Sequence, residues 1–176
     1  LALCSANMAE PTIGPNSDTI ATDHFDTLLW TGNNTDDRDI TGLDFQPDLV
    51  IFKKRSGNTE PGSVDSSNPT TNGDSGYTGT VNMLHPSNAG AATSGNGRSD
   101  GGFKAFLSNG FTTGQAPAQS GYPNAGYEAI NLGDATYVAW NWKANAGTAT
   151  SSGSESGNNP AFSVQANAKA GFSIVN

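Results

Sequence analysis

Apolar and polar residues alternate with a period of two along several stretches of the chain, most clearly in residues 136–144 (TYVAWNWKA). Side chains of an extended strand point alternately to its two faces, so Trp140 and Trp142 share one face, and Tyr137 and Ala139 the other. In a helix the two indole rings would diverge by about 200°. We therefore predict a central strand whose tryptophan face fills a sandwich core, with a ligand-stacking aromatic platform as the alternative.

Other stretches predict further strands. Residues 24–31 (HFDTLLWT) alternate and end at a Gly-Asn pair, and residues 49–54 (LVIFKK) form a short apolar run. Residues 102–113 read as a hairpin, since Asn109-Gly110 is a favoured two-residue turn. Residues 161–167 and 171–176 close the chain as two short strands.

The segments between these strands are rich in small and polar residues, above all 56–101 and 114–126. The chain has 22 glycines in 176 residues and only 14% charged residues, and periodic runs of helix formers are missing. This favours an all-β fold, a single jelly-roll or concanavalin-like β-sandwich with long Gly/Ser/Asn-rich loops and extended termini. We expect an N-terminal arm at 1–23, the sandwich at 24–144, a low-complexity linker or loop at 145–160, and C-terminal strands at 161–176.

Charge narrows the range of partners. The formal net charge is −8, with only eight lysines and arginines, so no basic stripe is available to neutralise phosphates or an anionic membrane surface. No apolar run approaches 18 residues, so we expect no membrane insertion. The single cysteine, Cys4, has no partner for an internal disulfide. Low lysine and high Ser/Thr/Asn content is typical of extracellular or virion-surface proteins.

The sequence shows no recognisable catalytic arrangement. His24 lies beside Asp23 and Asp26 at the start of a strand, and His85 lies in a loop; neither has a nucleophile at a known spacing. His85 also lacks a His or Cys partner at metal-ligand spacing. We expect a protein that is not an enzyme and binds no cofactor.

Two weaker motifs fall in one polar loop. Asp36, Asp37 and Asp39 are candidate calcium ligands, but the spacing is not that of an EF-hand, so a solvated loop is favoured. Asn33 begins an Asn-Asn-Thr tripeptide that matches the N-glycosylation pattern.

Carbohydrate binding is the main rival to a structural role. Tyr77, Tyr122 and Tyr127 lie in Gly-rich loops with Asn or Asp nearby, which are the residue types that sugar sites use. Loop tyrosines also pack as lids over a core, so both interpretations stay open.

Several of these stretches together resemble a repeat domain of bacteriophage tail-fibre-like and virion structural proteins. They are FDTLLWTGN (25–33), ITGLDFQPDLVIFKKR (40–55), TYVAWNWKA (136–144) and AGFSIV (170–175), with the lead-in LCSANMAEPTIGP (3–15). The resemblance implies a jelly-roll or lectin-like β-sandwich, usually within a longer and often repeated chain, with no catalytic residues. Members of that family often carry cysteine between the two tryptophans, where this chain has Asn141, so no redox role is implied.

Both ends of the chain carry spaced apolar residues that are candidate subunit contacts. These are Leu1, Leu3, Met8, Ile13 and Ile20 at the start and Phe172, Ile174 and Val175 at the end. Residues 172–175 (FSIV) also echo residues 25–28 (FDTL), so the last strand could pair with a sheet edge of a neighbouring subunit. The alternative is that both ends fold back on their own domain.

The expected function is therefore mechanical. We expect a structural subunit that self-assembles through its termini into an extracellular fibre or virion appendage, as a helical or head-to-tail homopolymer. The alternative is a lectin-like module of a phage tail fibre that binds carbohydrate or a host surface.

Overall fold

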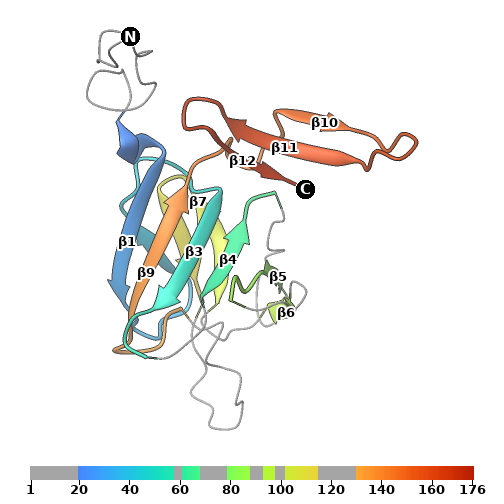
Figure 1. Ribbon diagram of the computed structural model, residues 1–176. Coiled ribbons are helices and arrows are strands. Elements are labelled where there is room, and N and C mark those ends of the chain that lie inside the picture. The colour runs from blue at the N-terminus through green and yellow to red at the C-terminus, as the bar shows by residue number, and fades with distance from the viewer. Residues whose placement is uncertain (1–19, 58–60, 68–78, 88–92, 98–101, 115–129) are drawn as a thin grey trace.

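The computed structural model describes residues 20–57, 61–67, 79–87, 93–97, 102–114 and 130–176, and shows an all-β sandwich (Figure 1). A short 3-10 turn, η2 (Ala21–Asp23), precedes the first strand. The strands are β1 (Phe25–Thr31), β2 (Arg38–Thr41), β3 (Leu49–Lys54), β4 (Gly62–Asp65), β5 (Gly79–Met83), β6 (Thr93–Gly97), β7 (Phe103–Leu107), β8 (Gly110–Thr113), β9 (Thr136–Trp142), β10 (Ser151–Gly153), β11 (Phe162–Asn167) and β12 (Phe172–Val175). The all-β sandwich expected from the sequence is confirmed.

Two antiparallel sheets form the sandwich. A four-stranded sheet in the order β1-β9-β3-β4 lies in front of a three-stranded sheet in the order β2-β8-β7 (Figure 1). β5 and β6 form a separate hairpin beside β4. β9, predicted to be a central strand, pairs with β1 on one side and β3 on the other.

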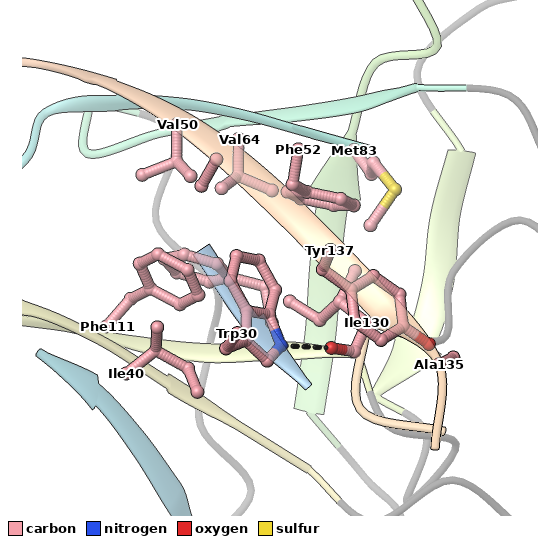
Figure 2. Close-up of a cluster of buried hydrophobic side chains, with 12 residues drawn as sticks. Trp30, Ile40, Val50, Phe52, Val64, Met83, Phe111, Ile130, Ala135 and Tyr137 are labelled. Atoms are coloured by element: carbon pink, nitrogen blue, oxygen red, sulfur yellow. Dashed lines mark hydrogen bonds between the residues drawn. The ribbon is translucent and has the colours of Figure 1, made fainter. Parts of the chain in front are cut away.

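The core lies between the two sheets and centres on Trp30 of β1 (Figure 2). Its indole stacks on Tyr137 of β9 at 5.2 Å and meets Phe111 of β8 edge-on at 5.6 Å. The indole Nε1 donates a hydrogen bond to the backbone oxygen of Ile130, at 2.8 Å. The buried polar atom is therefore satisfied while the ring supplies a large apolar area.

The prediction that the tryptophan face of β9 fills the core is wrong. Tyr137, Ala139 and Asn141 are completely buried, whereas Trp140 and Trp142 are half-buried on the outer face of the sheet. Trp30 lies directly across from Tyr137 on the neighbouring strand, so these two rings already occupy the space between the sheets. The alternation along β9 was correct, but the buried face is the opposite one.

Other strand predictions are confirmed, with local differences. β3 has the predicted bounds, and the two C-terminal strands are β11 and β12. The predicted hairpin is β7–β8, but its turn lies at Ser108-Asn109, and Gly110 begins β8. A Cβ atom at Gly110 would lie 2.0 Å from the carbonyl oxygen of Ile40, so close pairing with β2 requires glycine inside the strand. β2 itself begins within the stretch that was predicted to be a polar loop.

The chain ends in a separate three-stranded sheet, in the order β10-β11-β12, which projects from one end of the sandwich (Figure 1). β10 lies within residues 145–160, which were predicted to be a low-complexity linker or loop. β12 pairs along one edge with β11 of the same chain. We call β10–β12 the C-terminal sheet.

Candidate functional site

The outer face of the four-stranded sheet carries apolar side chains in rows across its strands. In one row, Phe25 of β1, Trp142 of β9 and Leu49 of β3 lie side by side; in the next, Trp140 lies between Thr27 and Ile51. Leu29 follows one row further along and is 64% exposed. We call these residues, with Val138, the outer face.

An aromatic stack connects the outer face to the C-terminal sheet. The Trp142 ring lies 4.9 Å from the Phe25 ring and 6.4 Å from the Phe172 ring of β12, centroid to centroid. Trp142 and Phe172 are nearly parallel, with an interplanar angle of 25°. Such pairs stabilise by about 0.5–1.5 kcal/mol beyond the area that they bury. β12 is thus held against the end of the sandwich where β1 begins.

A buried carboxylate at the entrance to β3 reinforces this junction by binding the loop that follows β9. Asp48 is completely buried, and its side chain accepts hydrogen bonds from the backbone N–H groups of Ala144 (2.6 Å), Ala146 (3.0 Å) and Gly147 (2.9 Å). The hydroxyl of Ser66 donates a fourth, at 2.6 Å. Backbone donors take the place of a cation here, which makes burial of the carboxylate tolerable.

Gln165 of β11 joins the same network from the C-terminal sheet. Its Oε1 accepts from the N–H groups of Asn145 and Gly147, and its Nε2 donates to the hydroxyls of Ser66 and Ser67 at 2.8 and 2.6 Å. Both N–H groups and both acceptor positions of its amide therefore form hydrogen bonds, and Gln165 is 1% exposed. We call Asp48, Ser66 and Gln165 the junction network.

A second contact ties β11 to the start of β1. His24 is buried, and its Nδ1 lies 2.8 Å from the Nδ2 of Asn167. The same amide donates to the backbone oxygen of Lys143. His24 therefore takes part in a structural contact, and the chain enters β1 immediately beside the β11–β12 turn.

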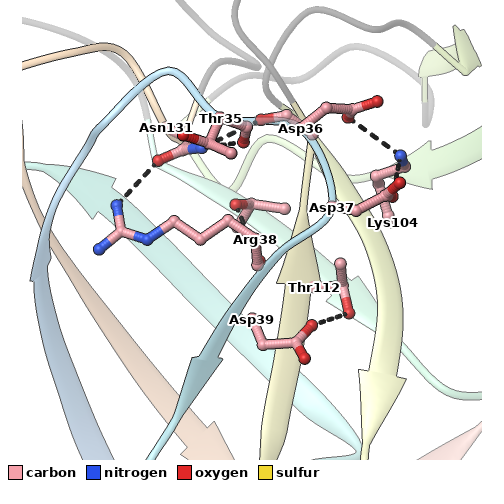
Figure 3. A network of polar contacts seen from close by, with 10 residues as sticks. Thr35, Asp36, Asp37, Arg38, Asp39, Lys104, Thr112 and Asn131 are labelled. Atoms are coloured by element: carbon pink, nitrogen blue, oxygen red, sulfur yellow. Dashed lines mark hydrogen bonds and ion pairs between the residues drawn. The ribbon is translucent and has the colours of Figure 1, made fainter.

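The three candidate calcium ligands take different partners (Figure 3). The ammonium group of Lys104 pairs with Asp36 at 3.0 Å and with Asp37, whereas Asp39 accepts a hydrogen bond from the hydroxyl of Thr112 at 2.8 Å. Partial burial lowers the pKa of Lys104, but its bonds to Asp37 and Asp36 raise it more, so that on balance it lies above the ordinary 10.5. Across the described ranges, no three His, Cys, Asp or Glu side chains gather as a metal site.

The loop that carries Asp36 is held in place by hydrogen bonds to Asn131, which is completely buried. Its Oδ1 accepts from the guanidinium of Arg38 at 3.0 Å and from the backbone N–H of Asn33, and its Nδ2 donates to the carbonyl of Thr35 at 2.8 Å. Asn33, the candidate glycosylation site, has an exposed side chain whose Oδ1 accepts from the N–H of Thr35. Its glycosylation stays a prediction.

The remaining candidate residues divide between the two ends and the loops. Leu1, Leu3, Met8, Ile13, Tyr77, Tyr122 and Tyr127 lie outside the described residues. Ile20 and Val175 are 55% and 62% exposed, whereas Phe172 and Ile174 are half-buried. The structure thus brings Ile20 and β12 to the same end of the sandwich, because His24 contacts Asn167.

Sequence reasoning did not identify the junction network. Asp48, Ser66 and Gln165 lie far apart in the chain and belong to no motif. It also placed Trp140 and Trp142 on the wrong side of the sheet. For the tryptophans alternation gave no decision, because the opposite face of β9 also carries a large ring, Tyr137.

No helix within the described residues is long and apolar enough to cross a membrane. A family model described as a domain of unknown function, DUF7483, matches residues 20–176. No curated protein and no solved structure matches the chain.

Proposed function

The chain belongs to the DUF7483 family of domains of unknown function, and from its surface we propose that it is a structural subunit that assembles with copies of itself into an extracellular fibre or virion appendage. Its role is then mechanical: the two ends of the chain join neighbouring copies.

One observation carries this proposal. Apolar side chains are exposed near both ends of the described chain: Ile20 (55% exposed) and Phe25 (38%) at the start of β1, and Val175 (62%) on β12 of the C-terminal sheet. Isolated exposed apolar residues are normal, but their presence at both ends fits a subunit that makes contacts through its two ends. The resemblance of several stretches to phage tail-fibre-like proteins supports the same role.

The geometry of the junction favours an open assembly. The aromatic stack and the junction network hold the C-terminal sheet in one orientation on the sandwich. A contact made by the two ends of the chain joins different surfaces of the two copies, so it is heterologous. A heterologous contact builds a filament unless the rotation closes it into a ring.

A second candidate function is carbohydrate binding. Trp140 lies on the outer face of the sheet, where its half-buried indole ring can stack on a sugar ring, whereas Trp142 already packs between Phe25 and Phe172. Tyr77, Tyr122 and Tyr127, the earlier candidates, lie outside the described residues. This role is compatible with a fibre.

Sedimentation velocity of the full chain over a wide concentration range separates the two functions. Self-assembly predicts species larger than the monomer that grow with concentration. Carbohydrate binding instead predicts saturable binding on a glycan array, which Trp140→Ala reduces at least tenfold while Leu29→Ala, a control on the same face, leaves it within threefold. A monomer at every concentration would refute the structural proposal.

A further inference from the structure

We propose that residues 1–8 of one copy (LALCSANM) add as a β-strand to the open edge of β12 in a second copy. This inference rests on the proposed self-assembly and names the two surfaces that make the contact. Three features support it: the backbone groups of β12, the apolar side chains beside them, and the composition of the N-terminal segment that precedes Ile20.

The hydrogen-bond pattern of the C-terminal sheet leaves backbone groups of β12 directed away from β11. Ser163 and Asn176 exchange both of their backbone hydrogen bonds, at 2.8 and 2.9 Å. In an antiparallel pair, bonded and non-bonded residue pairs alternate. Ile174 and Phe172 therefore point their N–H and C=O groups toward β11, whereas Ser173 and Val175 point theirs outward, opposite Ala166 and Val164.

A bond on the other side of β11 agrees with this assignment. The carbonyl of Val164 accepts from the N–H of Thr150, on the β10 side, so Val164 directs its backbone away from β12. β12 is the outermost strand of its sheet. Its two outward residues offer two donors and two acceptors, the pattern that an added strand requires.

The β1 edge of the main sheet is different, because side chains of the same chain bond to part of it. By the same alternation, Phe25, Thr27, Leu29 and Thr31 of β1 point outward, and two of these four are capped. The carboxylate of Asp26 accepts the N–H of Thr27 at 2.7 Å, and the guanidinium of Arg38 donates to the carbonyl of Thr31 at 2.6 Å. Such capping hinders pairing with a further strand. β12 therefore presents the more accessible of these two edges.

Apolar side chains accompany the open edge. Val175 and Val164 are cross-strand neighbours on the face of the C-terminal sheet that points away from Gln165. Phe162 lies two residues along on the same face of β11. Val175 is 62% exposed and Phe162 45% exposed. An incoming apolar strand would bury both beside its backbone hydrogen bonds.

Residues 1–8 lack the residue types that oppose strand pairing. They contain no charge, glycine or proline, and Leu1 and Leu3 would share one face. The first residues that oppose strand pairing are Glu10 and Pro11. Each later candidate within residues 9–19 includes a proline, a glycine or a charge.

The described N-terminus lies close to β12, so a short spacer is enough to bring residues 1–8 to an edge of this kind. Ile20 leads through η2 to His24, which contacts Asn167 beside the start of β12. Residues 9–19 are an eleven-residue spacer that contains Pro11, Gly14 and Pro15. At about 3.1–3.3 Å per extended residue the spacer reaches roughly 35 Å, and each proline restricts its own φ and the residue before it. A spacer of that reach allows pairing within the chain or between copies, so the choice of a second copy rests on the proposed self-assembly, and the crosslinking below distinguishes the two.

Disulfide trapping tests the pairing directly, because Cys4 is the only cysteine in the chain. In the full-length Ser173→Cys variant, mild oxidation should yield covalent ladders of two, three and more copies. The matched control is Ser152→Cys, on β10 at the far edge of the same sheet, which should crosslink at least tenfold more slowly. The Cys4→Ser, Ser173→Cys double variant should give no species beyond a dimer.

A backbone variant gives an independent measurement. Val175→Pro removes an outward N–H and no bond to β11, and should weaken association about tenfold, the effect of one lost hydrogen bond. Val175→Thr, which keeps the N–H and the branched side chain, should change it less than about threefold. Protection of β11 in hydrogen exchange verifies that the C-terminal sheet remains formed in both variants.

The outcomes separate this inference from the proposed function. A disulfide between Cys4 and residue 173 within one chain would show that the segment folds back, and would overturn the inference. Assembly that proceeds with equal crosslinking at positions 152 and 173 would also overturn it, while self-assembly would stand. A full chain that stays monomeric would refute both.

Discussion

Replacing Asp48 by alanine should loosen the C-terminal sheet and destabilise the protein by about 4 kcal/mol. The carboxylate accepts four hydrogen bonds, three of them from the backbone of the loop that leads into β10. A hydrogen bond to a charged group contributes roughly 1.5–3 kcal/mol, and a buried donor left without a partner costs about 1–3 kcal/mol. Water that enters the vacated space recovers part of this loss, so we place the total well below the sum.

Asp48→Asn should cost less, about 2 kcal/mol, because the amide keeps one acceptor oxygen but turns an NH₂ group toward backbone donors. Since a domain of this kind is stable by about 5–15 kcal/mol, the alanine variant should still fold. Its first effect should be local: Gly147 donates to both Asp48 and Gln165, so the loop and β11 lose their common contact.

Urea unfolding followed by tryptophan fluorescence gives the change in the free energy of unfolding. Hydrogen exchange read by mass spectrometry shows where the structure opens. We expect faster exchange in residues 145–176 of Asp48→Ala, with residues 25–54 little changed. Asp44→Ala, at an exposed carboxylate four residues away, is the control and should change stability by less than about 0.5 kcal/mol. An Asp48→Ala protein within about 1 kcal/mol of the parent would refute the reasoning.

Three further predictions follow from particular contacts. Gly32→Ala should destabilise by more than about 3 kcal/mol, because its Cβ would lie 1.9 Å from the carbonyl oxygen of Leu132; Gly133→Ala, whose nearest contact is 3.8 Å, should cost under about 1 kcal/mol in the same urea titration. Millimolar calcium should leave the melting temperature unchanged, because the Lys104 ammonium already pairs with Asp36 and Asp37. A melting temperature several degrees higher in calcium than in EDTA would contradict this and indicate that the loop binds calcium. Burial raises the pKa of the Tyr137 hydroxyl above 10.0, so the unfolded chain ionises first and stability should fall as pH rises above about 10; Tyr137→Phe should flatten that dependence, and an equal slope in both proteins would contradict it.

Strand positions could be predicted because alternation and turn residues are local signals. β3 was predicted at its observed bounds, and the β7–β8 hairpin was found from its Asn-Gly pair. The turn shifted by one residue because Gly110 meets the Ile40 carbonyl, which belongs to a strand about 70 residues earlier. The position of the turn therefore depends on a contact between distant strands, which the local sequence pattern does not contain.

The orientation of β9 could not be predicted from alternation, because both of its faces carry large rings. A period of two divides side chains into two sets but does not say which set is buried. Trp30 decides the matter, since it stacks on Tyr137 across the strand pair and bonds to Ile130. Trp140 and Trp142 are left on the outer face, where Trp142 packs between Phe25 and Phe172.

The junction network was also beyond sequence reasoning, for a different reason. Asp48 follows Pro47 at the entrance to β3, where a carboxylate reads as an ordinary solvated residue. Its donors come from residues 144–147 and from Ser66, and only the folded sheet brings these groups together. A buried acid whose partners are backbone N–H groups leaves no spacing signature in the sequence.

Electron microscopy of the full chain beside a version that starts at Ile20 tests the central claim most directly. The account predicts filaments or rings from the full chain, and their loss on truncation while circular dichroism shows that the β-sandwich remains folded. A full chain that stays monomeric at high concentration, or a truncated chain that assembles equally well, would contradict it.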